Sequence, residues 1–98
     1  MPWYDLQPSD YARGLRYSAD RSDECATRQM ADGKPWSGYE VERFHRQARR
    51  LRAMALLCDR STAARAGDID FLGLMNPAQS REDEDAAIAS ILNCEEPA

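Results

Sequence analysis

Residues 37–67, SGYEVERFHRQARRLRAMALLCDRSTAARAG, constrain the fold more than any other part of this sequence. Ser37 and Glu40 have the spacing of a capping box, in which the serine hydroxyl accepts the Glu40 N–H. Gly67 is able to adopt the left-handed conformation that ends a helix. Between them, apolar residues recur at steps of three and four, which places them on one helical face: Val41, Phe44, Ala48, Leu51, Ala55 and Cys58. The sequence therefore predicts one long helix over residues 38–66.

The second half of this helix is apolar on nearly every side. Met54, Leu56 and Leu57 point away from the stripe that the first half presents. A helix that is apolar all round has to be covered all round. The cover comes either from the C-terminal third of the chain or from a second copy of the protein, so a homodimer through residues 54–58 is an open alternative.

A first long helix is predicted over residues 10–31. Ser9 is a good N-cap, and Gly33 stands just beyond the expected end. The inward stripe is made mainly of small residues: Ala12, Leu15, Ala19, Ser22, Cys25, Ala26 and Met30. Small residues allow two helix backbones to approach closely. The connection over residues 32–37 is so short that the two helices must form an antiparallel hairpin. Trp36 is expected to act as a hydrophobic staple against Tyr39 or Val41.

The rest of the chain is expected to close this hairpin. Residues 68–75 offer one helical turn, or alternatively a short strand, and its large apolar residues would cover residues 54–58. Ser80 is able to cap a last helix over residues 81–93, followed by an acidic tail at 94–98. Residues 1–8 carry Trp3 and Tyr4, which either fold back over the end of the helix pair or form an exposed anchor for a partner. The predicted fold class is an all-α single domain over residues 1–98, a small helical bundle.

Charge is divided sharply along the chain, although the net charge is only −4. Residues 34–66 hold eight Lys and Arg against three acids, and residues 67–98 hold one Arg against eight acids. The long helix carries an arginine stripe whose like charges repel at spacings of three and four: Arg43, Arg46, Arg49, Arg50 and Arg52. Something negative should therefore lie against it. The candidates are the acidic run Glu82, Asp83, Glu84 and Asp85 of the same chain, an acidic surface of a protein partner, or the phosphates of a nucleic acid.

The sequence offers little for catalysis. His45 is the only histidine, and no ligand spacing for a metal is visible around it or around the three cysteines. Its position at the edge of the apolar face is typical of a histidine that hydrogen-bonds to a neighbour. A helix-turn-helix with residues 68–75 as the recognition element is disfavoured, because that segment is acidic and apolar. We expect no enzyme, no cofactor and no metal site.

The start of the chain lacks the basic and apolar regions of a signal peptide, and no apolar run approaches the length of a membrane span. Cys25, Cys58 and Cys94 are an odd number without a CxxC pair, as in proteins that keep reduced thiols. The expected location is therefore cytoplasmic, without membrane association.

A short, acidic, Ala- and Arg-rich helical chain without an active site is similar in style to many small accessory proteins of bacteria, their phages and plasmids. That similarity implies stoichiometric binding to a larger machine, and inhibitors of host defence are a familiar subset. We therefore predict an inhibitor or adaptor of a larger complex, such as one that processes nucleic acid, with a nucleic-acid-binding or structural module that uses the Arg-rich helix over residues 43–52 as the alternative. The predicted partner-binding residues are Arg43, Arg46, Arg49, Arg50, Glu82, Asp83, Glu84, Asp85, Trp36 and Tyr39.

Overall fold

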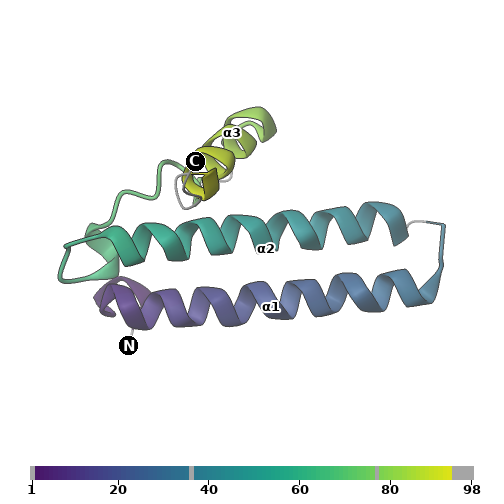
Figure 1. The fold of residues 1–98 in the computed structure, drawn as a ribbon, viewed down its shortest axis with the longest axis horizontal. Helices are drawn as coiled ribbons and strands as arrows, with labels where there is room; N and C mark the ends of the chain where they lie inside the picture. Colours follow the sequence, from purple (N-terminus) through teal and green to yellow (C-terminus); the bar gives the residue numbers. More distant parts are fainter. Residues whose placement is uncertain (1, 36, 77, 94–98) are drawn as a thin grey trace.

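The protein is built from an antiparallel pair of long helices with a third helix laid across them (Figure 1). The computed structural model describes residues 2–35, 37–76 and 78–93. These residues form α1 (Pro8–Asp32), α2 (Ser37–Arg60) and α3 (Arg81–Asn93), with two short 3-10 helices, η1 (Trp3–Asp5) and η2 (Ala66–Asp68), and no strand. The predicted all-α fold with a helical hairpin and a C-terminal helix is confirmed.

The first helix starts earlier than its sequence predicts. It begins at Pro8, with Gln7 as the N-cap, so Ser9 lies inside the first turn and does not cap it. Proline suits the first helical position because its missing N–H would have had no partner there. The other end agrees with the prediction, since Gly33 adopts a left-handed conformation with φ of 62° directly after Asp32.

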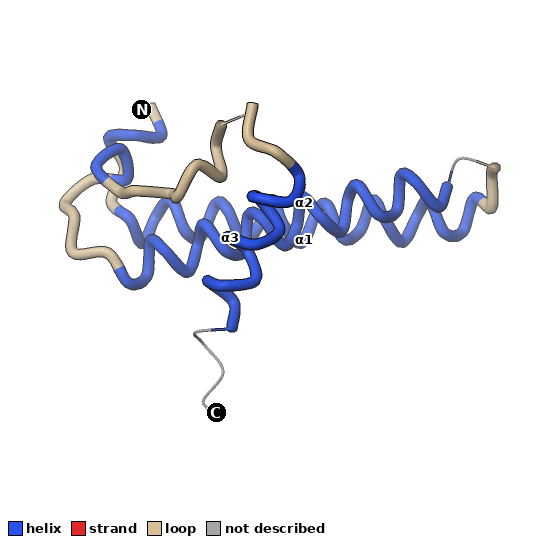
Figure 2. The backbone as a smooth tube through the Cα atoms, turned by 90° about the horizontal axis from the view of Figure 1, so that it is seen from above, coloured by secondary structure: helices blue, strands red, loops and turns tan. Residues whose placement is uncertain are grey.

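The seam between α1 and α2 consists mainly of small side chains, as the sequence predicts. Ala12, Ala19 and Ala26 of α1 are at most 1% exposed, and so is Ala48 of α2. The predicted stripe is wrong at its far end, because Met30 is 64% exposed. Figures 1 and 2 show why: the half of the hairpin that contains the connection between the helices extends past α3, so no third element lies there to cover a large side chain.

The second helix ends at Arg60, six residues before its predicted end at residue 66. Two competing hydrogen bonds explain the difference. The hydroxyl of Ser61 accepts the N–H of Ala63 at 3.0 Å, and the N–H of Ala66 is donated to the carbonyl of Leu6 at 2.8 Å. Serine side chains that bond nearby backbone in this way favour the end of a helix. Gly67 is therefore not a helix cap, and lies in η2 instead.

The predicted capping box at the start of α2 is also wrong. Ser37 is itself helical and largely buried, and its hydroxyl accepts the N–H of Lys34 at 2.9 Å instead of the N–H of Glu40. This bond ties the connection between the helices to the first turn of α2. The predicted staple by Trp36 and the acidic tail at 94–98 lie outside the described residues.

The segment after η2 forms neither the predicted helical turn nor a strand. It passes through a tight turn in which Leu72 and Gly73 both have positive φ, 56° and 79°, and the N–H of Leu74 is donated to the carbonyl of Phe71 at 3.0 Å. The turn buries Phe71 and Leu74 but leaves Leu72 and Met75 exposed, at 48% and 45%. Only part of the predicted cover is therefore supplied by this segment.

Helix α3 supplies the remaining cover. It lies on the side of α2 away from α1 (Figure 1) and runs across the hairpin (Figure 2). As predicted, it begins after Ser80, whose hydroxyl accepts the N–H of Asp83 at 3.1 Å. One core joins all of these elements: Ala12, Leu15, Ala53, Met54, Ala55, Cys58, Phe71, Leu74, Ile88 and Ile91. Residues 54–58 are thus packed largely against their own chain, and the homodimer through them stays an untested alternative.

The N-terminal arm folds back over one end of the helix pair. The bond from Ala66 to Leu6 ties it to η2, and the ring of Trp3 stacks on that of Tyr11 with centroids 5.2 Å apart. Trp3 also contacts Phe71 edge-on, at 6.5 Å between centroids. Trp3 and Tyr4 nevertheless remain 38% and 50% exposed, so the arm both covers the core and presents aromatic surface.

Candidate functional site

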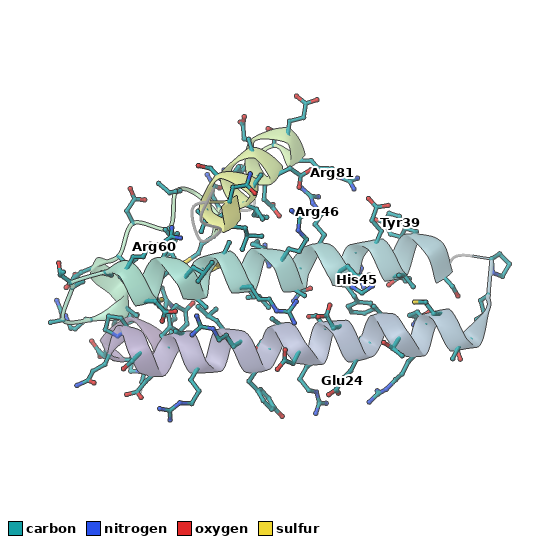
Figure 3. The ribbon with its side chains drawn as sticks, in the orientation of Figure 1. Glu24, Tyr39, His45, Arg46, Arg60 and Arg81 are labelled. Atoms are coloured by element: carbon teal, nitrogen blue, oxygen red, sulfur yellow. The ribbon has the colours of Figure 1, made fainter. Side chains whose placement is uncertain are left out.

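The arginine stripe of α2 is partly neutralised by acids of the same chain. The Nε of Arg46 lies 3.2 Å from a carboxylate oxygen of Asp85, and an Nη lies 3.8 Å from Glu84. Arg46 also donates to the backbone carbonyl of Arg81 at 3.2 Å. Figure 3 shows Arg46 reaching from α2 toward α3 in this way. Two of the four predicted acids, Glu84 and Asp85, therefore act as partners of the stripe within the chain.

A second ion pair also joins α2 and α3, but here the arginine, Arg81, is on α3 and the acid, Glu42, is on α2. Tyr39 stands beside this pair, and with Arg43 and Arg46 these residues line a hollow of only about 80 Å³. Tyr39 itself is 69% exposed. The structure thus brings together three of the predicted partner-binding residues, Tyr39, Arg43 and Arg46, around a hollow too small for a ligand beyond an ion or a water cluster.

The other predicted residues of this face have different surroundings. Arg43 pairs with Glu40 at 2.9 Å, and its guanidinium stacks over the Phe44 ring at 5.2 Å. Arg49 is exposed and has no ion pair among the described residues. The carboxylates of Glu82 and Asp83 are likewise exposed, with no cation beside them in the described part of the chain.

His45 belongs to a charged network between α1 and α2. Its Nδ1 lies 3.0 Å from one oxygen of Asp23, and Arg52 donates to the other oxygen at 2.6 Å and to Asp20 at 3.0 Å. Partial burial alone would raise the pKa of Asp23, but hydrogen bonds from Arg52 and His45 outweigh it and hold that pKa below its usual value. The prediction of a boundary histidine bonded to a neighbour is confirmed. The network links the two helices at their surface.

Arg50 lies apart from these pairs, in a groove between the two long helices and the turn at residues 71–75. The groove has a volume of about 260 Å³ and otherwise apolar or aromatic walls: Tyr11, Leu15, Leu51, Met54, Leu74 and Met75. We call it the Arg50 groove. Burial there raises the pKa of Tyr11, with a smaller contribution from the Cys58 thiol, so the hydroxyl of Tyr11 stays neutral.

The guanidinium of Arg50 has an unmet hydrogen-bond donor. Its Nε is buried and has no partner, and no described acid forms an ion pair with this side chain. A buried donor that lacks an acceptor costs about 1–3 kcal/mol, and more for a charged group. Among the arginines predicted to contact a partner, Arg50 is therefore the one that the described part of the chain leaves least satisfied.

Exposed apolar side chains flank the Arg50 groove. Tyr11 forms one wall and stacks on Trp3, which in turn contacts Tyr4 edge-on with centroids 5.9 Å apart. Met75 also lines the groove, and the exposed Leu72 lies three residues earlier on the same turn. Tryptophan, tyrosine and arginine are the residue types most enriched at the energetic centres of protein interfaces. The groove and its flanks together combine all three.

The sequence contains one signal that points to this groove. Arg50 and Met54 are four residues apart, so they share a helical face, and Leu51 and Leu57 border it. That pattern places Arg50 where the arginine stripe gives way to apolar residues. It does not reveal that Tyr11 and residues 71–75 close the groove around it, because these come from distant parts of the chain.

The described residues contain no group of three or more His, Cys, Asp or Glu placed to hold a metal ion. No helix within the described part of the chain is long and apolar enough to span a bilayer. No protein-family model, no curated protein and no solved structure matches this chain. Any assignment of function must therefore rest on the site itself.

Proposed function

We propose that this protein acts by binding a protein partner stoichiometrically, as an inhibitor or adaptor of a larger complex. The observation that carries the proposal is the Arg50 groove, an open apolar groove flanked by the exposed rings of Trp3 and Tyr4. Contiguous exposed apolar surface of this kind marks interaction sites on proteins. Its small volume, about 260 Å³, suits one or two side chains of a partner better than a drug-sized ligand, which needs roughly 300–1,000 Å³.

Charge supports a protein partner over nucleic acid. A phosphate backbone is recognised by several unpaired cations that track it. On α2, however, Arg43, Arg46 and Arg52 each pair with carboxylates of the same chain. Of the four acids predicted to contact a partner, Glu82 and Asp83 are exposed without a described cation, and they would repel phosphates and attract a basic surface.

The same proposal includes the kind of partner, a complex that processes nucleic acid. A machine that processes nucleic acid has a basic surface of the kind that Glu82 and Asp83 would meet. Inhibition of a host defence system by a phage or mobile-element accessory protein is the form of this function that the similarity in style to small accessory proteins implies.

The test is a pull-down with the tagged full chain from a bacterial lysate, with and without nuclease, followed by mass spectrometry and staining for nucleic acid. We expect a protein retained in stoichiometric amount that survives nuclease. Retained nucleic acid, with proteins that are lost after nuclease treatment, would instead establish the arginine helix as a nucleic-acid-binding element. Retention of neither would contradict both functions.

A further inference from the structure

The groove that supports a binding function also specifies what kind of segment it takes, and this inference rests on the proposed function. Its walls present one fixed charge among apolar side chains, the guanidinium of Arg50 between Leu51, Met54 and Met75. Among the described residues, this charge has no carboxylate partner. A guanidinium offers two parallel N–H donors along one edge, which fits a carboxylate in a bidentate pair.

The position of Arg50 separates it from its neighbour on the helix. Arg49 also lacks an ion pair among the described residues, but it is exposed and lies by His45 and Arg81, on the side of α2 that faces the start of α3. Arg50 is half-buried, and its Nε is shielded from water. An ion pair formed in such a place is screened less than one formed at Arg49.

Leu72 supplies a second feature of the same surface. A leucine with φ of 56° is unfavourable, because its Cβ crowds the backbone in the left-handed region. Positive φ at two successive turn positions is where Asn-Gly is preferred, and here the pair is Leu72-Gly73. The side chain of Leu72 is also 48% exposed, so it adds little to the core. Leu72 therefore costs the fold conformational strain and adds little to its core, whereas its exposed side chain suits an apolar contact with a partner.

We propose that the Arg50 groove binds a linear segment of a partner that carries a large apolar side chain close to a carboxylate. The apolar side chain enters between Tyr11, Met54 and Met75, and Leu72 packs against the segment outside the groove. The carboxylate pairs end-on with the two Nη groups of Arg50, because the Nε is shielded. The partner's motif is thus an acidic apolar one, in contrast to the basic surface expected opposite Glu82 and Asp83.

The test uses a displayed library of random 12-residue peptides, selected on the immobilised full chain and then measured individually by fluorescence polarisation. We expect enriched peptides to share Leu, Ile, Met or Phe within a few residues of Asp or Glu. Arg50→Met should weaken the best peptide at least tenfold, since a charge-assisted bidentate pair is lost. The affinity of Arg50→Lys for this peptide should lie between those of the original chain and of Arg50→Met. Leu72→Asn should weaken binding several-fold.

Arg49→Met is the matched control, because it removes the same charge from the adjacent residue outside the groove. It should change peptide affinity less than twofold. Equal losses of peptide affinity for Arg49→Met and Arg50→Met would contradict binding in the Arg50 groove. They would indicate instead that the arginine stripe as a whole attracts the peptide. Selection of peptides without acids, or no enrichment above an unrelated protein, would overturn the proposed motif. Thermal unfolding of each variant checks that the fold is kept.

Failure of this inference is distinguishable from failure of the proposed function. If Arg50→Met retains the lysate partner as well as the original chain does, the protein binds a partner but not through this groove. If the original chain retains no lysate protein while its selected peptides still depend on Arg50, the groove binds such segments and the inhibitor or adaptor function is wrong.

Discussion

Gly67 packs directly against Tyr4. A Cβ placed on Gly67 would lie 2.7 Å from the Cβ of Tyr4 and 3.1 Å from its carbonyl oxygen. These contacts join the N-terminal arm to η2 next to the hydrogen bond between Ala66 and Leu6. Because one of the close atoms is backbone, no rotation of a side chain relieves the contact. The absence of a side chain at residue 67 is therefore what allows the arm to dock.

Gly67→Ala should lower the free energy of unfolding by about 1–3 kcal/mol, the usual cost of a forced backbone shift in a packed region. Urea denaturation measures it. Gly14→Ala is the control, because Gly14 lies inside α1 with nothing within 4 Å of the added Cβ. That change should stabilise the protein by about 0.5–1 kcal/mol. Equal effects of the two substitutions would contradict the docking of the arm on Gly67.

Leu72→Asn should stabilise the protein while it weakens binding. Relief of the left-handed leucine is worth about 1–2 kcal/mol, offset in part by the lost contacts of a half-exposed side chain. The measurement is the midpoint of urea unfolding, compared with Leu74→Ala, which should destabilise by about 2–5 kcal/mol because Leu74 is 1% exposed. A net loss of stability for Leu72→Asn would show that Leu72 serves the fold.

Apolar packing, more than ion pairs, should hold α3 on α2. Ile88→Ala should cost about 2–5 kcal/mol, since Ile88 is 1% exposed. Arg46→Gln should cost less than about 1 kcal/mol, because Asp85 is half exposed and its attraction is screened. Thermal unfolding of the two variants measures both losses of stability, and a comparison of low and high salt shows how far each loss depends on charge. A larger loss for Arg46→Gln than for Ile88→Ala would reverse this ranking.

Asp23→Asn should destabilise the protein at neutral pH by about 0.5–1 kcal/mol, as expected for a surface network. The pKa of Asp23 is lowered in the folded state, so its stabilisation is complete above the usual value near 3.8 and is lost as the pH falls through the folded pKa. The difference between the two proteins should therefore shrink below about pH 4. Unfolding curves from pH 3 to 7 measure it.

Glu24→Gln is the control for that series, since Glu24 points away from α2 (Figure 3). It removes a carboxylate from the same helix without touching the His45 network, and should change stability less at pH 7. A difference between Asp23→Asn and the original chain that stays constant down to pH 3 would contradict the role of the Asp23 carboxylate.

Local patterns predicted most of the helical content correctly. The bounds of α3 follow from Ser80 and the apolar spacing after it, and Gly33 ends α1 as expected. The errors lie where a long-range contact replaces a local preference. Residues 61–66 have a helical composition, but the N–H of Ala66 is taken by Leu6, sixty residues earlier in the chain.

The candidate site shows the same division. The arginine stripe and the acidic run were visible in the sequence, and opposite charge pointed to a pairing between them within the chain. Only the packing of α3 across α2 decided that Arg46 meets Glu84 and Asp85 while Glu82 and Asp83 stay free of a described cation. Which acid faces which arginine depends on the crossing of the helices, and no pattern along one helix encodes that.

The sequence alone determined the class of the fold, because apolar spacing, small residues and capping residues act over a few positions within each helix. The tertiary structure decided which hydrogen-bond donors lack a partner and which apolar side chains stay exposed. Arg50 lies in a groove because Tyr11 and the turn at residues 71–75 pack around it, and the same turn, with positive φ at Leu72 and Gly73, leaves Leu72 exposed. Burial of a donor depends on every element packed around it, so it follows from the assembled fold.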